Sequence, residues 1–279
     1  MQHSFTKLAA FAVFAIGNFA YASAPISTVK MIEGLERGQA MMQTHDNAPG
    51  PVGACNLQGA QSQCVNAADS YSFNGCSIDS GKIIVSGSWD EAFTGPDANK
   101  CSMTLGDGDA VVRTSKGLTL TFQSGEALAS DTLGGTAYDG TVIPATGVAS
   151  ALAAGVTTVT VNGAHLIYKD STGIEREEAF VISTAPFHMQ GQQTDGSLII
   201  NDGALRVFHQ MDKHTSDVTL DKVAWSDKAC CHPVSGTITE VMSGSQTGTR
   251  TATFTSTCGA VQVVDVDGSS STYNLPACQ

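Results

Sequence analysis

The stretch ALRVFHQMDKHTSDVTL, residues 204–220, decides the fold class of this chain. A four-residue loop at 210–213 would fold it into a hairpin whose leucines and valines share one face, because side chains alternate between the two faces of a strand. The same register puts Arg206 opposite Asp217 on the other face, as a cross-strand pair of opposite charge. The stretch therefore predicts two antiparallel strands with one apolar and one polar face.

Two further segments predict hairpins of the same kind. In TTVTVNGAHLIY (157–168) the turn is Asn162–Gly163, and in SLIINDGALRVF (197–208) it is Asp202–Gly203. Both dipeptides favour two-residue hairpin turns, and both registers collect the apolar residues on one face. The sequence thus predicts an all-β protein of antiparallel hairpin or meander sheets, arranged as a sandwich or a curled half-barrel and stapled by disulfides.

The N-terminus has the three-part layout of a secretory signal. Lys7 precedes an apolar run, Leu8–Ile16, and small residues follow up to Ala22, after which we expect cleavage. The apolar run is too short to span a bilayer as a stable helix. We expect an exported protein, periplasmic, outer-surface or extracellular, with no transmembrane segment after cleavage.

Composition divides the rest of the chain. Residues 23–54 are expected to form a stem or linker with a short helix over Ser27–Met42. Residues 55–128 form an N-terminal β region and residues 156–279 a C-terminal antiparallel β region. Between them, residues 129–155 are predicted to be a linker of low charge.

The net charge excludes some partners. The full chain carries a formal charge of −12, and without residues 1–22 it holds 13 Lys and Arg against 26 Asp and Glu. Nucleic acid binding depends on clustered basic side chains that neutralise phosphates, and anionic membranes attract the same side chains. The acidity therefore disfavours both partners, and an unknown protein, a glycan or an apolar ligand remains.

An even set of cysteines in an exported chain predicts disulfides. We expect one of Cys230 and Cys231 to bond Cys258 and the other Cys278, because neighbouring residues of an extended chain point to opposite faces. The four N-terminal cysteines should pair among themselves. The cysteines are Cys55, Cys64, Cys76, Cys101, Cys230, Cys231, Cys258 and Cys278.

Three segments resemble pieces of metal sites. Cys230, Cys231 and His232 lack the C-x-x-C spacing that zinc prefers, and an oxidising compartment opposes free thiolates. GDGDA (106–110) and DVDGSS (265–270) lack the distal glutamate of an EF-hand loop. We interpret the first segment as disulfide cysteines and the other two as hairpin turns, and predict no cofactor.

His209 and His214 are the one weak metal candidate. The predicted hairpin places them opposite each other on its buried side, where two imidazoles can share an ion. Asp212 or His188 would supply a third ligand. The interpretation we favour is two half-exposed histidines that close the end of the strand pair.

A catalytic interpretation depends on carboxylates. Glu175 and Glu177 fall on one face of a predicted strand, as a glycosidase pair would, but their charged neighbours favour a solvated outer face. Trp89 and Trp225 are expected in the core. The sequence contains no nucleophile elbow, Walker loop or H-E-x-x-H motif.

The leading hypothesis is a non-enzymatic exported β protein that works as a surface, envelope or adhesin-like binding or structural module. One alternative is a carrier of an apolar or lipid ligand in a curled β-sheet. The other is a secreted hydrolase with a carboxylate or histidine site built from Glu175, Glu177, His209 or His214.

Overall fold

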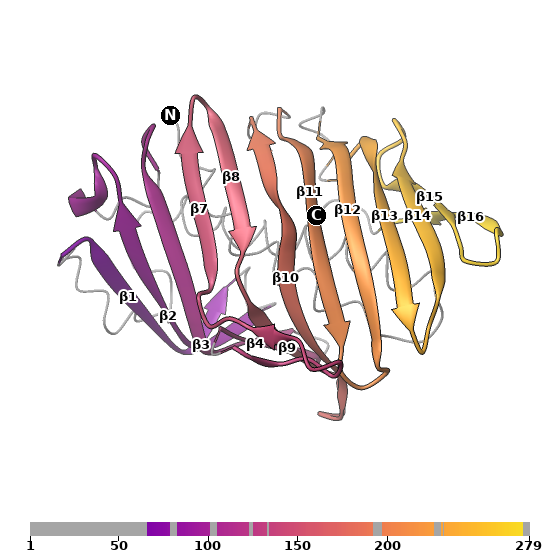
Figure 1. Ribbon diagram of the computed structural model, residues 1–279, viewed down its shortest axis with the longest axis horizontal. Coiled ribbons are helices and arrows are strands. Elements are labelled where there is room, and N and C mark those ends of the chain that lie inside the picture. Colours follow the sequence, from indigo (N-terminus) through magenta and orange to yellow (C-terminus); the bar gives the residue numbers. More distant parts are fainter. Residues whose placement is uncertain are drawn as a thin grey trace.

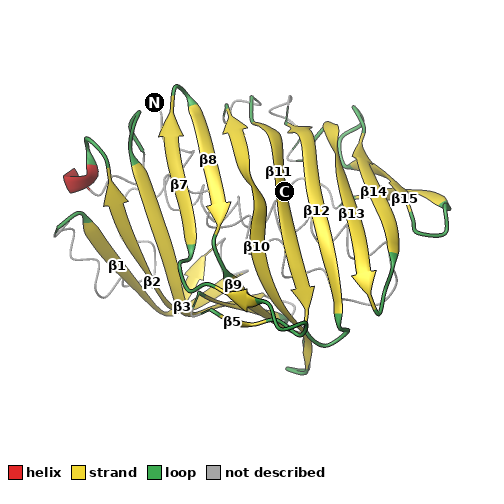
Figure 2. Ribbon diagram, in the orientation of Figure 1, coloured by secondary structure: helices red, strands yellow, loops and turns green. Residues whose placement is uncertain are grey.

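The structure is a computed structural model that describes residues 66–78, 83–100, 105–122, 125–132, 134–191, 197–225, 230 and 232–275. Within these ranges helical structure is confined to the 3-10 turn η2 (Ala98–Lys100), and nearly all else is antiparallel β-sheet (Figure 2). No helix in the described ranges is long and apolar enough to cross a membrane. The predicted all-β class is confirmed, whereas the signal peptide, stem and short helix lie outside the described residues.

The strands follow one another along the sequence, and short turns join most of them. They are β1 (Ala68–Ile78), β2 (Ile83–Thr94), β3 (Ala110–Phe122), β4 (Ala127–Asp131), β5 (Gly135–Thr136), β6 (Val142–Ile143), β7 (Val148–Ala153), β8 (Val156–Val161), β9 (Ala164–Lys169), β10 (Glu175–Gln190), β11 (Ile199–His209), β12 (His214–Ala224), β13 (Ser235–Gly244), β14 (Gly248–Phe254), β15 (Ala260–Val264) and β16 (Ser270–Asn274).

One 14-stranded sheet runs from β1 to β16, and it divides into two routes between β3 and β10. Residues 110–113 of β3 pair with β7, whereas residues 118–121 pair with β4. On β10, residues 187–189 pair with β8 and residues 175–181 with β9. Figure 1 shows β7 and β8 beside one end of the long strands and β4 and β9 beside the other. A separate β5–β6 pair completes the described strands.

The hairpin expected at 210–213 is confirmed. Arg206 lies opposite Asp217, and His209 lies opposite His214. The Arg206 guanidinium donates two hydrogen bonds to Asp217, at 2.7 and 2.8 Å. From here to β16 the meander continues through turns at 245–247 and at Asp267–Gly268, the second of which lies in the segment predicted to be a hairpin turn.

The hairpin predicted at Asn162–Gly163 is wrong, because β8 and β9 do not pair with each other. Both strands run along β10 instead, one after the other. A Cβ atom at position 163 would lie 2.0 Å from the carbonyl oxygen of Pro144, so the glycine permits a close backbone approach rather than a reversal. The predicted inward face is confirmed by the burial of Val159, Val161, Ala164 and Leu166.

The hairpin predicted at Asp202–Gly203 is also wrong. Strand β11 runs straight through these residues and pairs with β12 along its whole length. A Cβ atom at position 203 would lie 2.1 Å from Cδ1 of Phe187, so the glycine makes room for that ring. The sequence pattern suggested a turn because the inward-facing residues change from even to odd numbers here, at a register shift against β10.

Residues 129–155, expected to be a linker, contain β5, β6 and β7. Strand β7 lies between β3 and β8, and Val148 and Ser150 are buried on it. The division into N-terminal and C-terminal β regions stays a prediction, although both contribute strands to the same sheet.

The main core lies on one face of the sheet, here called the inner face. Val181, Val207 and Val218 have no exposed surface there, and they belong to a cluster that extends from Val148 on β7 to residues beyond β15. Trp225 is part of this cluster, as predicted, whereas the side chain of Trp89 lies outside the described residues. The opposite, outer face is covered at one place by the segment that carries β5 and β6.

That covering segment packs on β10 and β11. Ala137 and Ile143 contact Phe180 and Phe208, which point outward from the two strands. The Tyr138 hydroxyl forms a hydrogen bond of 2.9 Å with the side chain of Thr215 on β12. This small second core fixes the outer side of the same strands that carry the candidate site on their inner side.

Candidate functional site

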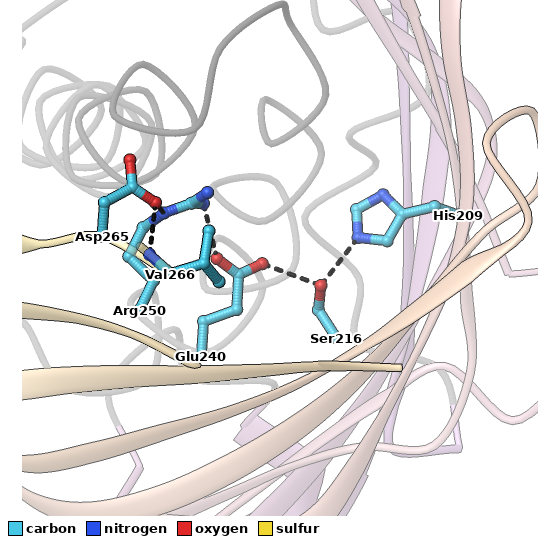
Figure 3. Close-up of polar contacts among 6 residues, drawn as sticks. All are labelled: His209, Ser216, Glu240, Arg250, Asp265 and Val266. Atoms are coloured by element: carbon cyan, nitrogen blue, oxygen red, sulfur yellow. Dashed lines mark hydrogen bonds and ion pairs between the residues drawn. The ribbon is translucent and has the colours of Figure 1, made fainter. Parts of the chain in front are cut away.

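A row of polar side chains crosses the inner face near the turn between β11 and β12. His209 Nδ1 lies 2.9 Å from Glu177 Oε1, and its Nε2 lies 3.2 Å from Ser216 Oγ. The Ser216 hydroxyl donates to Glu240 at 2.7 Å. Arg250 donates to the other oxygen of Glu240 at 2.9 Å. We call these five residues the polar row, and Figure 3 shows four of them in line from His209 to Arg250.

The sheet register builds this row. Val207 lies opposite Ser216, and Glu240 lies opposite Arg250, so each polar residue takes an inward position that continues the apolar series of its strand. Each link joins neighbouring strands, from β10 through β14. In Figure 3 strands pass both beneath and beside the drawn side chains, which shows the sheet curving around its inner face.

The far end of the row is an acidic turn. Arg250 Nε donates to Asp265 Oδ1 at 3.3 Å, and the same oxygen accepts the backbone N–H of Val266 at 2.7 Å. Arg250 thus contacts two carboxylates while its side chain is 4 % exposed. Two acids around one buried guanidinium compensate its charge.

His214 lies beside the polar row and stacks on His209. Their ring centroids are 4.0 Å apart and the ring planes differ by 9°. The residues are 2 % and 5 % exposed, so the prediction of a half-exposed pair underestimated their burial. Because lone pairs lie in the ring plane, two parallel stacked rings do not aim nitrogens at one ion. In the described part of the chain, no group of three or more His, Cys, Asp or Glu side chains is arranged so that it could hold a metal ion.

Burial changes the protonation of the row. It raises the pKa of Glu177 to about 9, and the negative charges of Asp212 and Glu178 act in the same direction. Burial lowers the pKa of His209 to about 4, although Glu240 and Asp212 oppose the shift. Burial and the neighbouring His209 lower the pKa of His214 to about 4. At neutral pH the carboxyl of Glu177 is therefore protonated and both imidazoles are neutral.

This protonation gives every link of the row a donor and an acceptor. The Glu177 hydroxyl donates to Nδ1 of His209, and the N–H at Nε2 of His209 donates to Ser216. Ser216 donates in turn to the ionised Glu240, whose charge is balanced by Arg250. Two atoms beside the row, Glu177 Oε2 and His214 Nδ1, are buried without a hydrogen-bond partner.

A carboxyl group, an imidazole and a hydroxyl follow one another in the order found in a serine catalytic triad. The geometry does not carry out that chemistry, because Ser216 is 0 % exposed and its proton points to Glu240 rather than to His209. An activated serine needs its proton directed to the base and its oxygen open to substrate. The row has the character of a closed hydrogen-bond network.

The predicted site residues separate in the structure. Glu177 joins His209 and His214, whereas Glu175 is exposed beyond a register shift in β10. The expectation that Glu177 lies on a solvated outer face is wrong, since that shift turns it inward, where it is 1 % exposed. His188 pairs with Asp202 at 2.6 Å, away from the polar row.

The loops interpreted as turns are turns. Asp109 accepts the backbone N–H groups of Gly106 and Asp97, each at 2.9 Å, so both of its oxygens hold the loop together. Asp267 Oδ1 accepts the N–H of Ser269 at 2.8 Å. These carboxylates stabilise backbone conformation in the way short polar side chains do at turns.

One predicted disulfide is confirmed. Of the neighbouring Cys230 and Cys231, it is Cys230 that bonds Cys258. Cys231 and Cys278, and the N-terminal Cys55, Cys64 and Cys101, lie outside the described residues. The same is true of the Cys76 side chain. Their pairings stay predictions.

Sequence reasoning missed Ser216, Glu240 and Arg250. The sequence did contain a signal for them. On β13, Glu240 takes the inward position between the apolar Ile238 and Met242, and on β14, Arg250 is the first buried residue of the alternating series. Opposite charges at inward positions of two consecutive strands are a pattern that predicts a buried ion pair.

Comparisons with known proteins add no assignment. No family model, no curated protein and no solved structure matches the chain.

Proposed function

We propose that this chain is an exported, non-enzymatic β protein that binds its partner through the outer face of β12 to β16. The supporting observation is a set of mostly uncharged polar side chains in register across these strands. One row consists of Thr219, Thr239, Thr251, Val264 and Ser270, and the next contains Thr237, Thr253, Gln262 and Thr272. All of these side chains are exposed or half-exposed.

Such a face suits binding to a polar surface. Threonine is stiff at χ1, so little side-chain entropy is lost when its hydroxyl is fixed by a partner. Neighbouring strands are roughly 4.8 Å apart and alternate residues roughly 6.7 Å apart, so the hydroxyls form a regular grid. In a chain with a net charge of −12 these rows hold a single charged side chain, that of Asp221 opposite Thr237, which favours a largely neutral polar partner such as a glycan or a polar protein surface.

The two alternative functions receive less support. A carrier needs an accessible apolar face, whereas Val181, Val207 and Val218 on the inner face have no exposed surface. A hydrolase needs an accessible nucleophile or acid, whereas Ser216 and Glu177 are buried within the polar row. The outer face is the one that offers ordered side chains to solvent.

A paired substitution tests the proposal. Thr239→Lys with Thr251→Lys places two charges at the centre of the grid, on two half-exposed positions that lie opposite each other. The control is Thr119→Lys with Thr121→Lys, two half-exposed threonines on the outer side of β3. We expect the first variant to lose binding to isolated cell-envelope fractions and to a glycan array, and the control to keep it. Equal binding by both variants, or no binding by the unaltered protein, would overturn the proposal.

A further inference from the structure

The polar row holds one end of the sheet together by side chains. Glu177 on β10, His209 on β11 and Ser216 on β12 are linked in sequence, and Glu240 on β13 continues the series to Arg250 on β14. The turn at 210–213 lies at this end, and three of its four residues are exposed. His209 therefore fixes the hairpin to β10, and Ser216, which His209 contacts, fixes it to β13.

Each charged group that faces the histidines comes from a different element. Glu177 faces them from β10, Asp212 from the turn, Glu240 from β13 and Arg250 from β14. Of the three acids, Glu177 is protonated and Glu240 is paired with Arg250. Asp212 is the remaining negative charge, and it lies on an exposed turn.

We propose that the stacked His209 and His214 form an acid-sensitive latch, which keeps the β11–β12 turn end closed at neutral pH and releases it in acid. The pair accommodates one proton beside Asp212, but a second proton places two cations face to face at 4.0 Å. No unpaired negative charge among the facing groups compensates the second cation. The rings then separate, and the links from His209 to Glu177 and Ser216 are lost.

The unpartnered Nδ1 of His214 supports this inference. A buried polar atom without a hydrogen bond costs free energy, and it remains only where the surrounding structure imposes it. Both histidines have a folded-state pKa of about 4 against an ordinary 6.5, so the closed state loses stability as the pH falls from about 6.5 to about 4. The inference does not depend on the binding function proposed for the outer face.

Hydrogen exchange of the full chain, corrected for the intrinsic effect of pH, tests the latch. We compare the amides of 205–220 with those of 111–121 on β3, at pH 7 and at about pH 4. Exchange at 205–220 should accelerate by about tenfold or more in acid, while exchange on β3 stays slow. Parallel acceleration in both segments would mean global acid unfolding and would overturn the latch.

Variants separate the histidine pair from other titrating groups. His214→Phe keeps a flat ring against His209 but takes no proton, so the acid acceleration should disappear. His214→Gln is a second, smaller neutral variant for the case in which the phenylalanine prevents folding. His188→Gln removes an exposed histidine paired with Asp202 and should behave like the unaltered protein. If neutral residues at 214 leave the acid response unchanged, the proposal is wrong.

Discussion

Glu240 and Arg250 lie directly opposite each other on β13 and β14, and their side chains form an ion pair of 2.9 Å that is almost fully buried. Glu240 also accepts a hydrogen bond from Ser216, and Arg250 also donates one to Asp265, so the pair connects four polar side chains. Arg206 and Asp217 form a pair with the same register on the outer face, where both side chains are about 40 % exposed. The two pairs differ chiefly in their contact with solvent.

This difference predicts different costs of substitution. Arg250→Met should lower the free energy of unfolding by about 3–5 kcal/mol, because it leaves the carboxylate of Glu240 buried without its cation. Arg206→Ala should cost less than about 1 kcal/mol, because water screens the exposed pair. Urea denaturation of both variants measures the two values, and similar losses would contradict the assignment of the faces.

The raised pKa of Glu177 predicts that the free energy of unfolding falls as the pH becomes alkaline. Its folded-state pKa of about 9 lies above its ordinary value of 4.5, so its contribution is fully present below about pH 4.5 and is lost as the pH rises through about 9. Glu177→Gln cannot ionise and still donates to His209, so its free energy of unfolding should depend less steeply on pH between about 6 and 9. An unchanged slope would show that Glu177 is ionised in the folded protein.

The disulfide pattern follows from the position of Cys230. Since Cys230 is bonded to Cys258, we expect peptide mapping without reduction to show Cys231 joined to Cys278. The four N-terminal cysteines should be joined among themselves. A vicinal Cys230–Cys231 bond, or a bond between the two groups, would contradict the pattern. Replacement of Cys230 and Cys258 by alanine should cost roughly 2–4 kcal/mol.

Export predicts a shortened chain. N-terminal sequencing of protein recovered outside the cytoplasm should begin at Ser23, after removal of residues 1–22. Alkylation of that protein under denaturing, non-reducing conditions should label no cysteine. Recovery of the full-length chain in the cytoplasm, with reactive thiols, would refute the expected compartment.

The sequence by itself determined the all-β class, the apolar inner face of the hairpin segments and the register of the 204–220 hairpin. These depend on a period of two in side-chain direction and on a short turn, which are local properties. The pairing of Arg206 with Asp217 and the juxtaposition of His209 with His214 followed from that register alone.

Only the tertiary structure decided which strands are neighbours. Asn162–Gly163 and Asp202–Gly203 have the sequence of hairpin turns, yet the backbone near Pro144 and the ring of Phe187 occupy the space beside these glycines, and the long β10 and β12 supply the pairing partners. In the same way, a register shift in β10 turned Glu177 inward to meet His209. Strand order and bulges depend on contacts between residues distant in sequence, and local propensity does not contain them.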